Sequence, residues 1–406
     1  MDYTILLYII ANSALLFSSI ENKSSMNNAI LEEHAGELLP CILEDTLDQE
    51  SYIEVSKKIN KKTLSYQLDT FFTNKAKWSN FNGSVLIEKN GVILYNKTFG
   101  IENNITKIPL SADSKFQLAS ISKQFTACAI LQLVQAKKID LNATVDKYIP
   151  GFPYAGVTVQ SLLCHRSGLP EYMHVFSTKI KDAYVTDNDE VLDWFAKEKP
   201  VIAAKPNTKF AYCNTNYLVL ASIVEKVSGQ DFASYMRKNI FLPLGMVNSF
   251  IITTDNENIN THRTTGYTGS WQEYKTDFFD GVVGDKGVYT TTHDMLLWSK
   301  AIYSECFIDK SLMTEAFMPR SFEKPGEKNY GYGFRLLHPQ SDTNKIVYHN
   351  GWWKGYNTCF YTSPYHKYTI IVFSNKYTRT VYAVQPVVDI LLGVKSNEVK
   401  VEEGAD

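Results

Sequence analysis

The sequence predicts an α+β fold, in which strands from both ends of one domain form an antiparallel sheet flanked by helices, with an inserted all-α region. Residues 83–89 and 92–95 are predicted strands, and the Asn90-Gly91 pair between them is typical of a tight hairpin. Four more segments of strand character close the chain, at residues 332–338, 345–352, 356–362 and 368–374. The stretches between these two groups are mostly helical, so the sheet must be assembled from both ends.

The same pattern divides the chain of 406 residues into parts. We expect the α/β part at about residues 75–115 and 275–395, and the helical part at about 116–274. The predicted parts of the chain are a signal or anchor segment at residues 1–20, a polar and helical lead-in at 21–74, the folded domain at 75–395 and a polar tail at 396–406.

The N-terminus carries an apolar run from Ile5 to Ile20 that Asn12 and Ser13 interrupt. It is short for a membrane span, and Asp2 stands where a signal peptide usually has a basic residue. We interpret it as an export signal, which predicts a periplasmic or extracellular protein. An uncleaved anchor that associates with the membrane or cell envelope, and a cytoplasmic start, remain open.

Composition excludes several classes of function. The net charge is -2 with both signs dispersed, so no basic surface for nucleic acid is expected. Eight histidines form no zinc-binding pattern, and we predict neither a metal nor a cofactor. The six cysteines are too sparse for a disulfide scaffold and show no metal-ligand spacing; they lie at positions 41, 128, 164, 213, 306 and 359.

A hydroxyl and an amine stand three residues apart in Ser120-Ile121-Ser122-Lys123, at the start of a long apolar helix. Residues at i and i+3 face the same side of a helix, so Lys123 can reach the Ser120 oxygen. Burial disfavours the ammonium form of a lysine, and the free amine could then activate the serine as a nucleophile. A second S-x-x-K at residues 321–324 lies among prolines, where no buried helix can start.

A second candidate motif, Tyr212-Cys213-Asn214, precedes an apolar helix that ends at Gly229. The Tyr212 hydroxyl could carry protons, and the Asn214 amide can both donate and accept hydrogen bonds. The ordinary alternative for Asn214 is to cap the following helix. A thiol nucleophile at Cys213 is an alternative that we disfavour, because no histidine is near it in sequence.

A third motif, His349-Asn350-Gly351, stands at the end of the predicted strand that begins with residues 345–348. A glycine here would let a substrate backbone lie against the strand edge, and an N–H just beyond it could donate to an oxyanion. Trp352 and Trp353 follow directly and could line a pocket or the core.

In this order and setting the three motifs resemble those of the serine β-lactamase-like family. That family includes class C β-lactamases, D-alanyl-D-alanine carboxypeptidases and related esterases and amidases. The resemblance spans roughly residues 75–392. Residues 162–170, 241–246 and 284–291 are similar to its "LLxHxSGLP", "PLGM" and "GGxxST" segments.

The resemblance implies a β-lactamase/DD-peptidase-like fold and three catalytic residues. Ser120 would be the acylated nucleophile, Lys123 its proton acceptor and Tyr212 the proton shuttle. The backbone N–H groups of Ser120 and Trp352 would form the oxyanion hole.

The resemblance also implies three substrate-binding residues: Asn214, His349 and Gly351. Asn214 would hold the substrate amide, and His349 would orient the Tyr212 hydroxyl or meet a substrate carboxylate. Many relatives have lysine where this chain has His349. Because a histidine is only partly protonated near neutrality, the difference argues against a dedicated β-lactamase.

The predicted function is therefore a serine hydrolase that forms an acyl-enzyme on amide or ester bonds, with D-amino-acid peptides or esters as the favoured substrates. Its partners would be small molecules or short peptides. Three alternatives stay open: a β-lactamase, a non-catalytic sensor that binds penicillin or peptide, and a surface protein that binds cell-wall fragments.

Overall fold

The computed structural model describes residues 36–46, 59–177, 185–252, 262–323 and 326–394. The predicted signal or anchor segment, most of the lead-in and the polar tail lie outside these residues. Within the described ranges, no helix combines the length and the apolar character that a membrane crossing requires.

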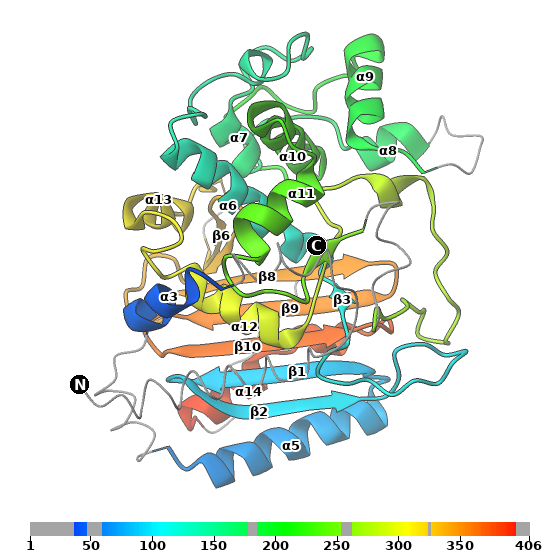
Figure 1. The fold of residues 1–406 in the computed structure, drawn as a ribbon, viewed down its shortest axis with the longest axis vertical. Coiled ribbons are helices and arrows are strands. Elements are labelled where there is room, and N and C mark those ends of the chain that lie inside the picture. Colours follow the sequence, from blue (N-terminus) through cyan, green and yellow to red (C-terminus); the bar gives the residue numbers. More distant parts are fainter. Residues whose placement is uncertain (1–35, 47–58, 178–184, 253–261, 324–325, 395–406) are drawn as a thin grey trace. The chain divides into compact units, whose positions relative to one another are not determined.

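A seven-stranded sheet in the order β2-β1-β10-β9-β8-β7-β6 occupies the middle of the domain (Figure 1). All of its neighbouring strands are antiparallel, and β1 pairs with β10, so the two ends of the domain meet inside the sheet. This confirms the predicted α+β architecture. The strands are β1 (Gly83–Lys89), β2 (Val92–Phe99), β6 (Lys328–Tyr330), β7 (Arg335–Leu337), β8 (Ile346–Trp353), β9 (Tyr356–Ser363) and β10 (Tyr368–Ser374).

Two details of this sheet follow directly from local sequence. Asn90 and Gly91 both take positive φ, 51° and 80°, as the tight turn between β1 and β2 requires. β8 extends through the third motif, whereas its partner β7 ends opposite Tyr348. Residues 349–353 of β8 therefore pair only with β9, and their other edge is left for the site described below.

Both faces of the sheet are covered. Val85 and Ile87 of β1 pack with Leu68 and Phe72 of α5 (Lys61–Trp78) and with α14 (Gln385–Leu392). Leu86 points to the opposite face and joins the larger core, to which α12 (Thr292–Ala301) also belongs. Because α5 packs on the sheet, the folded part of the chain begins before the expected boundary at residue 75.

The helical region is inserted between β1–β2 and the closing strands, and its helices gather together in Figure 1. At its centre is α6 (Ser122–Gln135), which is buried from Ser122 to Leu131 as its apolar sequence predicted. The other helices of this region are α7 (Val159–Leu163), α8 (Tyr172–Ser177), α9 (Asn188–Glu198), α10 (Thr215–Ser228) and α11 (Phe232–Met236). Outside it, α3 (Leu39–Thr46) precedes β1 and α13 (Lys310–Ala316) follows α12. Shorter turns are η1 (Ala119–Ile121), η2 (Val145–Lys147), η3 (Arg237–Phe241), η4 (Phe278–Gly281) and η5 (Arg379–Tyr382).

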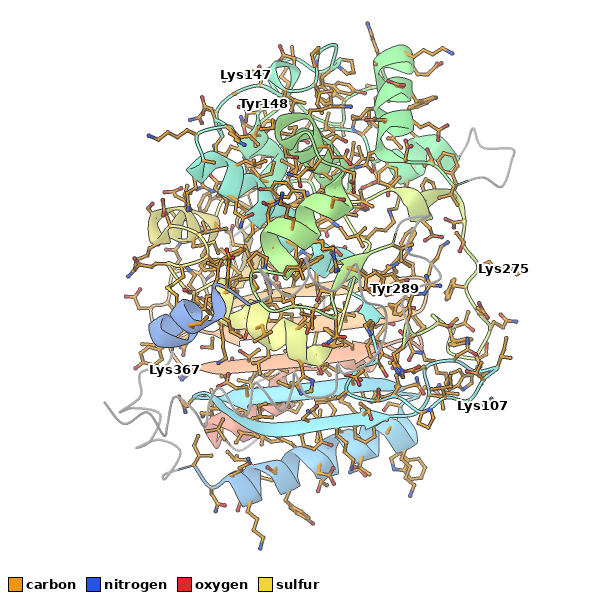
Figure 2. The ribbon with its side chains drawn as sticks, in the orientation of Figure 1. Lys107, Lys147, Tyr148, Lys275, Tyr289 and Lys367 are labelled. Carbon is orange, nitrogen blue, oxygen red and sulfur yellow. A yellow bond between two sulfur atoms is a disulfide. The ribbon has the colours of Figure 1, made fainter. Side chains whose placement is uncertain are left out.

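A second, three-stranded sheet was not predicted. It has the order β3-β5-β4 and consists of β3 (Phe116–Gln117), β5 (Val288–Thr290) and β4 (Phe250–Ile251). Tyr289 of β5, labelled in Figure 2, stacks on Phe250 with 5.3 Å between the ring centroids. Because β3 runs directly into the turn that carries Ser120, this small sheet fixes where that turn begins.

One disulfide joins Cys41 of α3 to Cys306, which lies between α12 and α13, with 6.1 Å between the Cα atoms. The cysteine spacing did not predict this bond. The four remaining cysteines, Cys128, Cys164, Cys213 and Cys359, are free and buried.

Loss of this disulfide is expected to lower the free energy of unfolding by about 2–5 kcal/mol, because it closes a long loop in the unfolded chain. Urea unfolding of Cys41→Ser, Cys306→Ser and the double variant measures the effect. All three should lose the same amount, since each removes the same bond. Midpoints equal to that of the oxidised wild type would contradict the prediction.

Candidate active site

Ser120 lies in η1, a turn of 3-10 helix directly before α6. In a 3-10 turn the side chains at i and i+3 eclipse, and the Lys123 Nζ lies 3.1 Å from the Ser120 Oγ. Ser120 is partly exposed, whereas Lys123 is fully buried. Ala119 holds a φ of 50° just before the serine, a strained conformation of the kind found at functional sites.

The Lys123 amine has three hydrogen-bond partners. It donates to the Asn214 Oδ1 at 2.8 Å and to the Asp285 backbone carbonyl at 2.9 Å, and the third partner is the Ser120 hydroxyl at 3.1 Å. Both of these oxygens can only accept. A neutral amine has two hydrogens and one lone pair, so when the hydrogens go to Asn214 and Asp285 the lone pair must face the Ser120 hydroxyl. This geometry suits proton transfer from the serine to the lysine.

The Asn214 side chain makes no capping hydrogen bond to α10, although the residue stands at the N-cap position. Its carbonyl oxygen binds Lys123 instead, so the ordinary capping interpretation does not describe it. Tyr212, from the same motif, places its ring centroid 5.1 Å from the Lys123 Nζ. The first two motifs therefore meet at the lysine.

Strand alternation directs His349, Gly351 and Trp353 to one face of β8. A Cβ at Gly351 would lie 2.1 Å from the Leu118 carbonyl oxygen, so only glycine lets the strand approach the turn that carries the nucleophile. The sequence had suggested contact with a substrate as the reason for this glycine. That substrate-binding role stays a prediction, and the close approach explains the glycine without it.

His349 is fully buried, and both of its ring nitrogens have partners. The Nδ1 lies 2.7 Å from the Asn350 carbonyl oxygen, to which it must donate, and the Nε2 accepts from the Tyr330 hydroxyl at 3.2 Å. Burial lowers the pKa of His349 well below its usual value, and the charges of Arg335 and Lys123 add to this. His349 is thus a neutral side chain beside Tyr212, with 6.4 Å between the ring centroids, rather than the partly protonated one that the sequence suggested.

A permanent positive charge nearby comes from Arg335, which the sequence motifs missed. It lies on β7, opposite Tyr348 in the register, and its guanidinium carbon is 5.2 Å from the Tyr212 ring centroid. Only the pairing of β7 with β8 brings this arginine to the site. A pattern of neighbouring residues could not have found it.

His165, from the segment at residues 162–170, packs against Tyr212 with 4.2 Å between the ring centroids. It is fully buried, and its Nδ1 accepts the Cys213 backbone N–H at 3.2 Å. Burial lowers the pKa of His165 well below its usual value. His165 therefore packs against the second motif, residues 212–214, and fixes its backbone through the hydrogen bond from Cys213.

We expect acid to destabilise the fold through His165 and His349. Their folded-state pKa values lie below the ordinary 6.5, so the stability they contribute is present above pH 6.5 and is lost as the pH falls below it. In the unfolded chain both histidines take up protons, which corresponds to about 2–3 kcal/mol between roughly pH 7.5 and 5.5. Urea unfolding at the two pH values measures this loss. The variant His349→Gln should show about half of the histidine contribution, and an unchanged pH dependence in that variant would contradict the assignment.

The oxyanion hole predicted from the Ser120 and Trp352 N–H groups is compatible with the register of the β8–β9 hairpin. A two-residue turn joins Trp353 to Tyr356, and such a flanking pair exchanges hydrogen bonds. The next pair, Trp352 with Asn357, therefore does not. The Trp352 N–H points away from β9, toward the strand edge that β7 leaves unpaired. Its role in binding an oxyanion stays a prediction.

Four polar residues behind Lys123 were not anticipated: Glu171, Tyr172, Asp285 and Lys286. Glu171 Oε2 accepts the Asn214 backbone N–H at 2.7 Å, and burial raises the pKa of this carboxyl group. Asp285 and Lys286 form an ion pair of 3.3 Å that also contacts Tyr172. Asp285 and Lys286 lie in the segment at residues 284–291 that resembles the family's "GGxxST" stretch, but the resemblance implied no role for their side chains.

The thiol alternative at Cys213 is not supported by its surroundings. Burial raises the pKa of this thiol to about 12, and the sulfur lies 3.4 Å from the Leu169 carbonyl oxygen. A protonated, enclosed thiol is a poor nucleophile. In the part of the chain that the structure describes, no three side chains of metal-ligating type cluster together.

The chain is similar to known proteins over most of its length. Residues 76–392 match the Beta-lactamase family. The sequence is 33% identical to penicillin-binding protein 4* of Bacillus subtilis strain 168, over 79% of this chain and 74% of that protein. The fold is similar to that of the octameric penicillin-binding protein homologue from Pyrococcus abyssi, with a TM-score of 0.72, 27% identity, and coverage of 84% of this chain and 79% of that one.

A third similar structure is the D-alanine carboxypeptidase AmpC from Burkholderia cenocepacia, with a TM-score of 0.67 and coverage of 82% of this chain and all of that one. At 19% identity this likeness shows the fold alone. The match over most of the chain is decisive, and the chain belongs to the beta-lactamase family, a family of serine hydrolases.

Proposed function

We propose that this protein is a serine hydrolase that forms a covalent acyl-enzyme at Ser120. Its favoured substrates are D-amino-acid peptides or esters. The observation that carries the proposal is the triple coordination of the Lys123 amine by Ser120, Asn214 and Asp285. Two of these contacts leave the lone pair no direction except toward the serine.

The reaction proceeds in two stages in this proposal. Lys123 takes the proton of Ser120 as its oxygen attacks the substrate carbonyl, and the N–H groups of Ser120 and Trp352 stabilise the oxyanion. Tyr212 passes a proton to the leaving amine or alcohol and takes one back from the Lys123 ammonium, so both groups return to their starting states. In the second stage Tyr212 and Lys123 take the proton of the water that attacks the acyl carbon, and this proton is returned to the Ser120 oxygen as its bond to the acyl carbon breaks.

The charges beside Tyr212 support a substrate that ends in a carboxylate. His349 is neutral, whereas Arg335 provides a permanent positive charge 5.2 Å from the Tyr212 ring centroid. A short peptide with a free carboxyl terminus fits this charge.

Export from the cytoplasm is also part of the proposal. A disulfide such as Cys41–Cys306 forms and persists in oxidising compartments and is rare in the cytosol. Fractionation of the native host, with alkylation of free thiols before lysis, tests this. Protein found in the cytosol with Cys41 and Cys306 both alkylated would contradict export.

A substrate panel tests the activity. Purified protein is incubated separately with a peptide ending in D-alanyl-D-alanine, a chromogenic ester and a chromogenic β-lactam, and turnover and intact mass are followed. We expect turnover of the peptide or the ester through a transient mass increase on Ser120. Fast β-lactam turnover alone would indicate a β-lactamase, and a stable adduct without turnover would indicate a sensor. No adduct and no turnover with any of the three would overturn the proposal.

A further inference from the structure

Asp285 and Lys286 form an ion pair that is withdrawn from solvent. The side chains are 1% and 4% exposed, and the Lys286 Nζ lies 3.3 Å from the Asp285 Oδ1. Replacing a buried ion pair by apolar residues is often neutral or stabilising, because removing two charges from water is costly. Stability alone is therefore a weak reason for this pair.

Asp285 reaches the site through its backbone. Its carbonyl oxygen accepts one hydrogen of the Lys123 amine at 2.9 Å, while its carboxylate accepts from the Tyr172 hydroxyl at 3.2 Å. Carbonyl and carboxylate belong to the same residue, so anchoring the side chain restrains the direction of the carbonyl.

The backbone around Asp285 has no regular secondary structure, and side chains hold its peptide groups. The Thr126 Oγ1 donates to the Gly284 carbonyl at 2.7 Å, and the Asn188 side chain binds the Val283 N–H and carbonyl. Residues 282–287 belong to neither helix nor strand, and the glycines on either side, Gly284 and Gly287, have φ of 99° and 101°. Glycine adopts positive φ without steric cost and is the most flexible residue, so this segment is less restrained by its own backbone than a segment without glycine would be. The orientation of its peptide groups must come from side-chain contacts.

Lys286 supplies the contacts that involve the Asp285 side chain itself. Its Nζ donates to the Tyr172 hydroxyl at 2.7 Å and to the Val282 carbonyl at 3.3 Å, and it lies 4.9 Å from the centroid of the Trp353 ring. Trp353 stands on β8, on the face that carries His349 and Gly351, and its Nε1 donates to Asp280 of η4 at 2.9 Å. The ion pair thus links the Asp285 segment to α8, η4 and β8 at once.

We propose that the Asp285–Lys286 ion pair is a positioning element for catalysis, which holds the Asp285 carbonyl against the Lys123 amine and so directs the lysine lone pair at Ser120. The inference rests on the proposed acyl-transfer function. Tyr172 belongs to the same element, since its hydroxyl accepts from Lys286 and donates to Asp285.

The test is the rate constant of acylation by a chromogenic ester, measured before the steady state and expressed per folded protein. In Lys286→Met we expect this constant to fall about 10- to 100-fold, because small misplacements of a base cost that much. The KM for the ester should change by less than about threefold, since the Lys286 side chain is only 4% exposed and is not available for contact with the substrate.

The matched control is Lys376→Met. Lys376 is also buried, at 5% exposure, and its Nζ lies 4.5 Å from the centroid of the Trp271 ring and donates to Asn80 at 3.1 Å. This variant removes the same kind of contact away from the site, so it should lose stability and keep the acylation rate. A purely structural role of Lys286 would give the two variants the same behaviour, and that result would overturn the inference.

Tyr172→Phe keeps the test decisive if Lys286→Met does not fold. It removes only the hydroxyl that bridges Lys286 and Asp285, and we expect acylation to slow about 3- to 10-fold. A wild-type rate in this variant would overturn the inference. Absence of acylation in the wild type would instead refute the proposed function, so the two failures are distinguishable.

Discussion

Ser120→Ala is expected to abolish covalent labelling and to lower kcat for a hydrolysed ester by on the order of 10⁴-fold or more, because no other described group can take the acyl chain at this position. Only the Oγ that faces Lys123 is removed, and Ser120 is partly exposed, so the fold should be retained. Intact mass after incubation with substrate measures the labelling, and burst kinetics measure the rate.

Ser122→Ala is the matched control for this experiment. Ser122 belongs to the same four-residue motif, but its Oγ is buried and accepts the Val288 backbone N–H at 3.2 Å. The change should cost about 1–3 kcal/mol of stability, because a buried donor loses its partner, and it should leave labelling intact. Labelling that survives in Ser120→Ala and disappears in Ser122→Ala would reverse the assignment of the nucleophile.

Replacement of Lys123 is expected to slow acylation about 10²- to 10⁴-fold, the usual contribution of a positioned base. Lys123→Met removes the amine, and Lys123→Arg keeps the charge but supplies a guanidinium that does not deprotonate. Acylation should therefore be slow in both variants, and the positive charge kept in Lys123→Arg should not restore the acylation rate. Stopped-flow measurement of the acylation step distinguishes this from slow deacylation.

Stability has to be followed in the same variants. Lys123→Met leaves the Asn214 Oδ1 and the Asp285 carbonyl without their lysine partner, at a cost of about 1–3 kcal/mol each. Lys115→Met serves as a control, because Lys115 is a buried lysine at 8% exposure in a segment before the nucleophile. Acylation of Lys123→Met within tenfold of the control would exclude Lys123 as the base.

The sequence predicted those parts of the fold that local patterns determine. The Asn90-Gly91 pair defines a hairpin by its own conformational preference, and the apolar run after Lys123 defines a buried helix. Of the short strands β3 to β7, the sequence predicted β7, within the longer segment at residues 332–338. The other four contain two or three residues each, too few for a period to appear. The disulfide was missed because its cysteines are separated by 265 residues, so only the folded chain brings them together.

The site divides in the same way. Ser120 and Lys123 meet because a single helical turn spans three residues, whatever the rest of the chain does. The Asp285 carbonyl reaches Lys123 from 162 residues away, and it is a backbone group that no side-chain pattern marks. The sequence identified the motif that contains His349 but not the side chains around it. The Nε2 of His349 binds the Tyr330 hydroxyl, and Tyr330 lies on another strand.

The pairing of β1 with β10 has a consequence for how the chain reaches its native state. The Ser374 hydroxyl at the end of β10 donates to the Asn82 carbonyl just before β1, across 292 residues of chain. During synthesis the first hairpin must therefore wait, with one strand edge unpaired, until β10 has left the ribosome 292 residues later. An exposed edge of this kind invites pairing with other chains, and non-local strand pairing is slow. Refolding yield should accordingly fall as protein concentration rises, with aggregation competing against closure of the sheet.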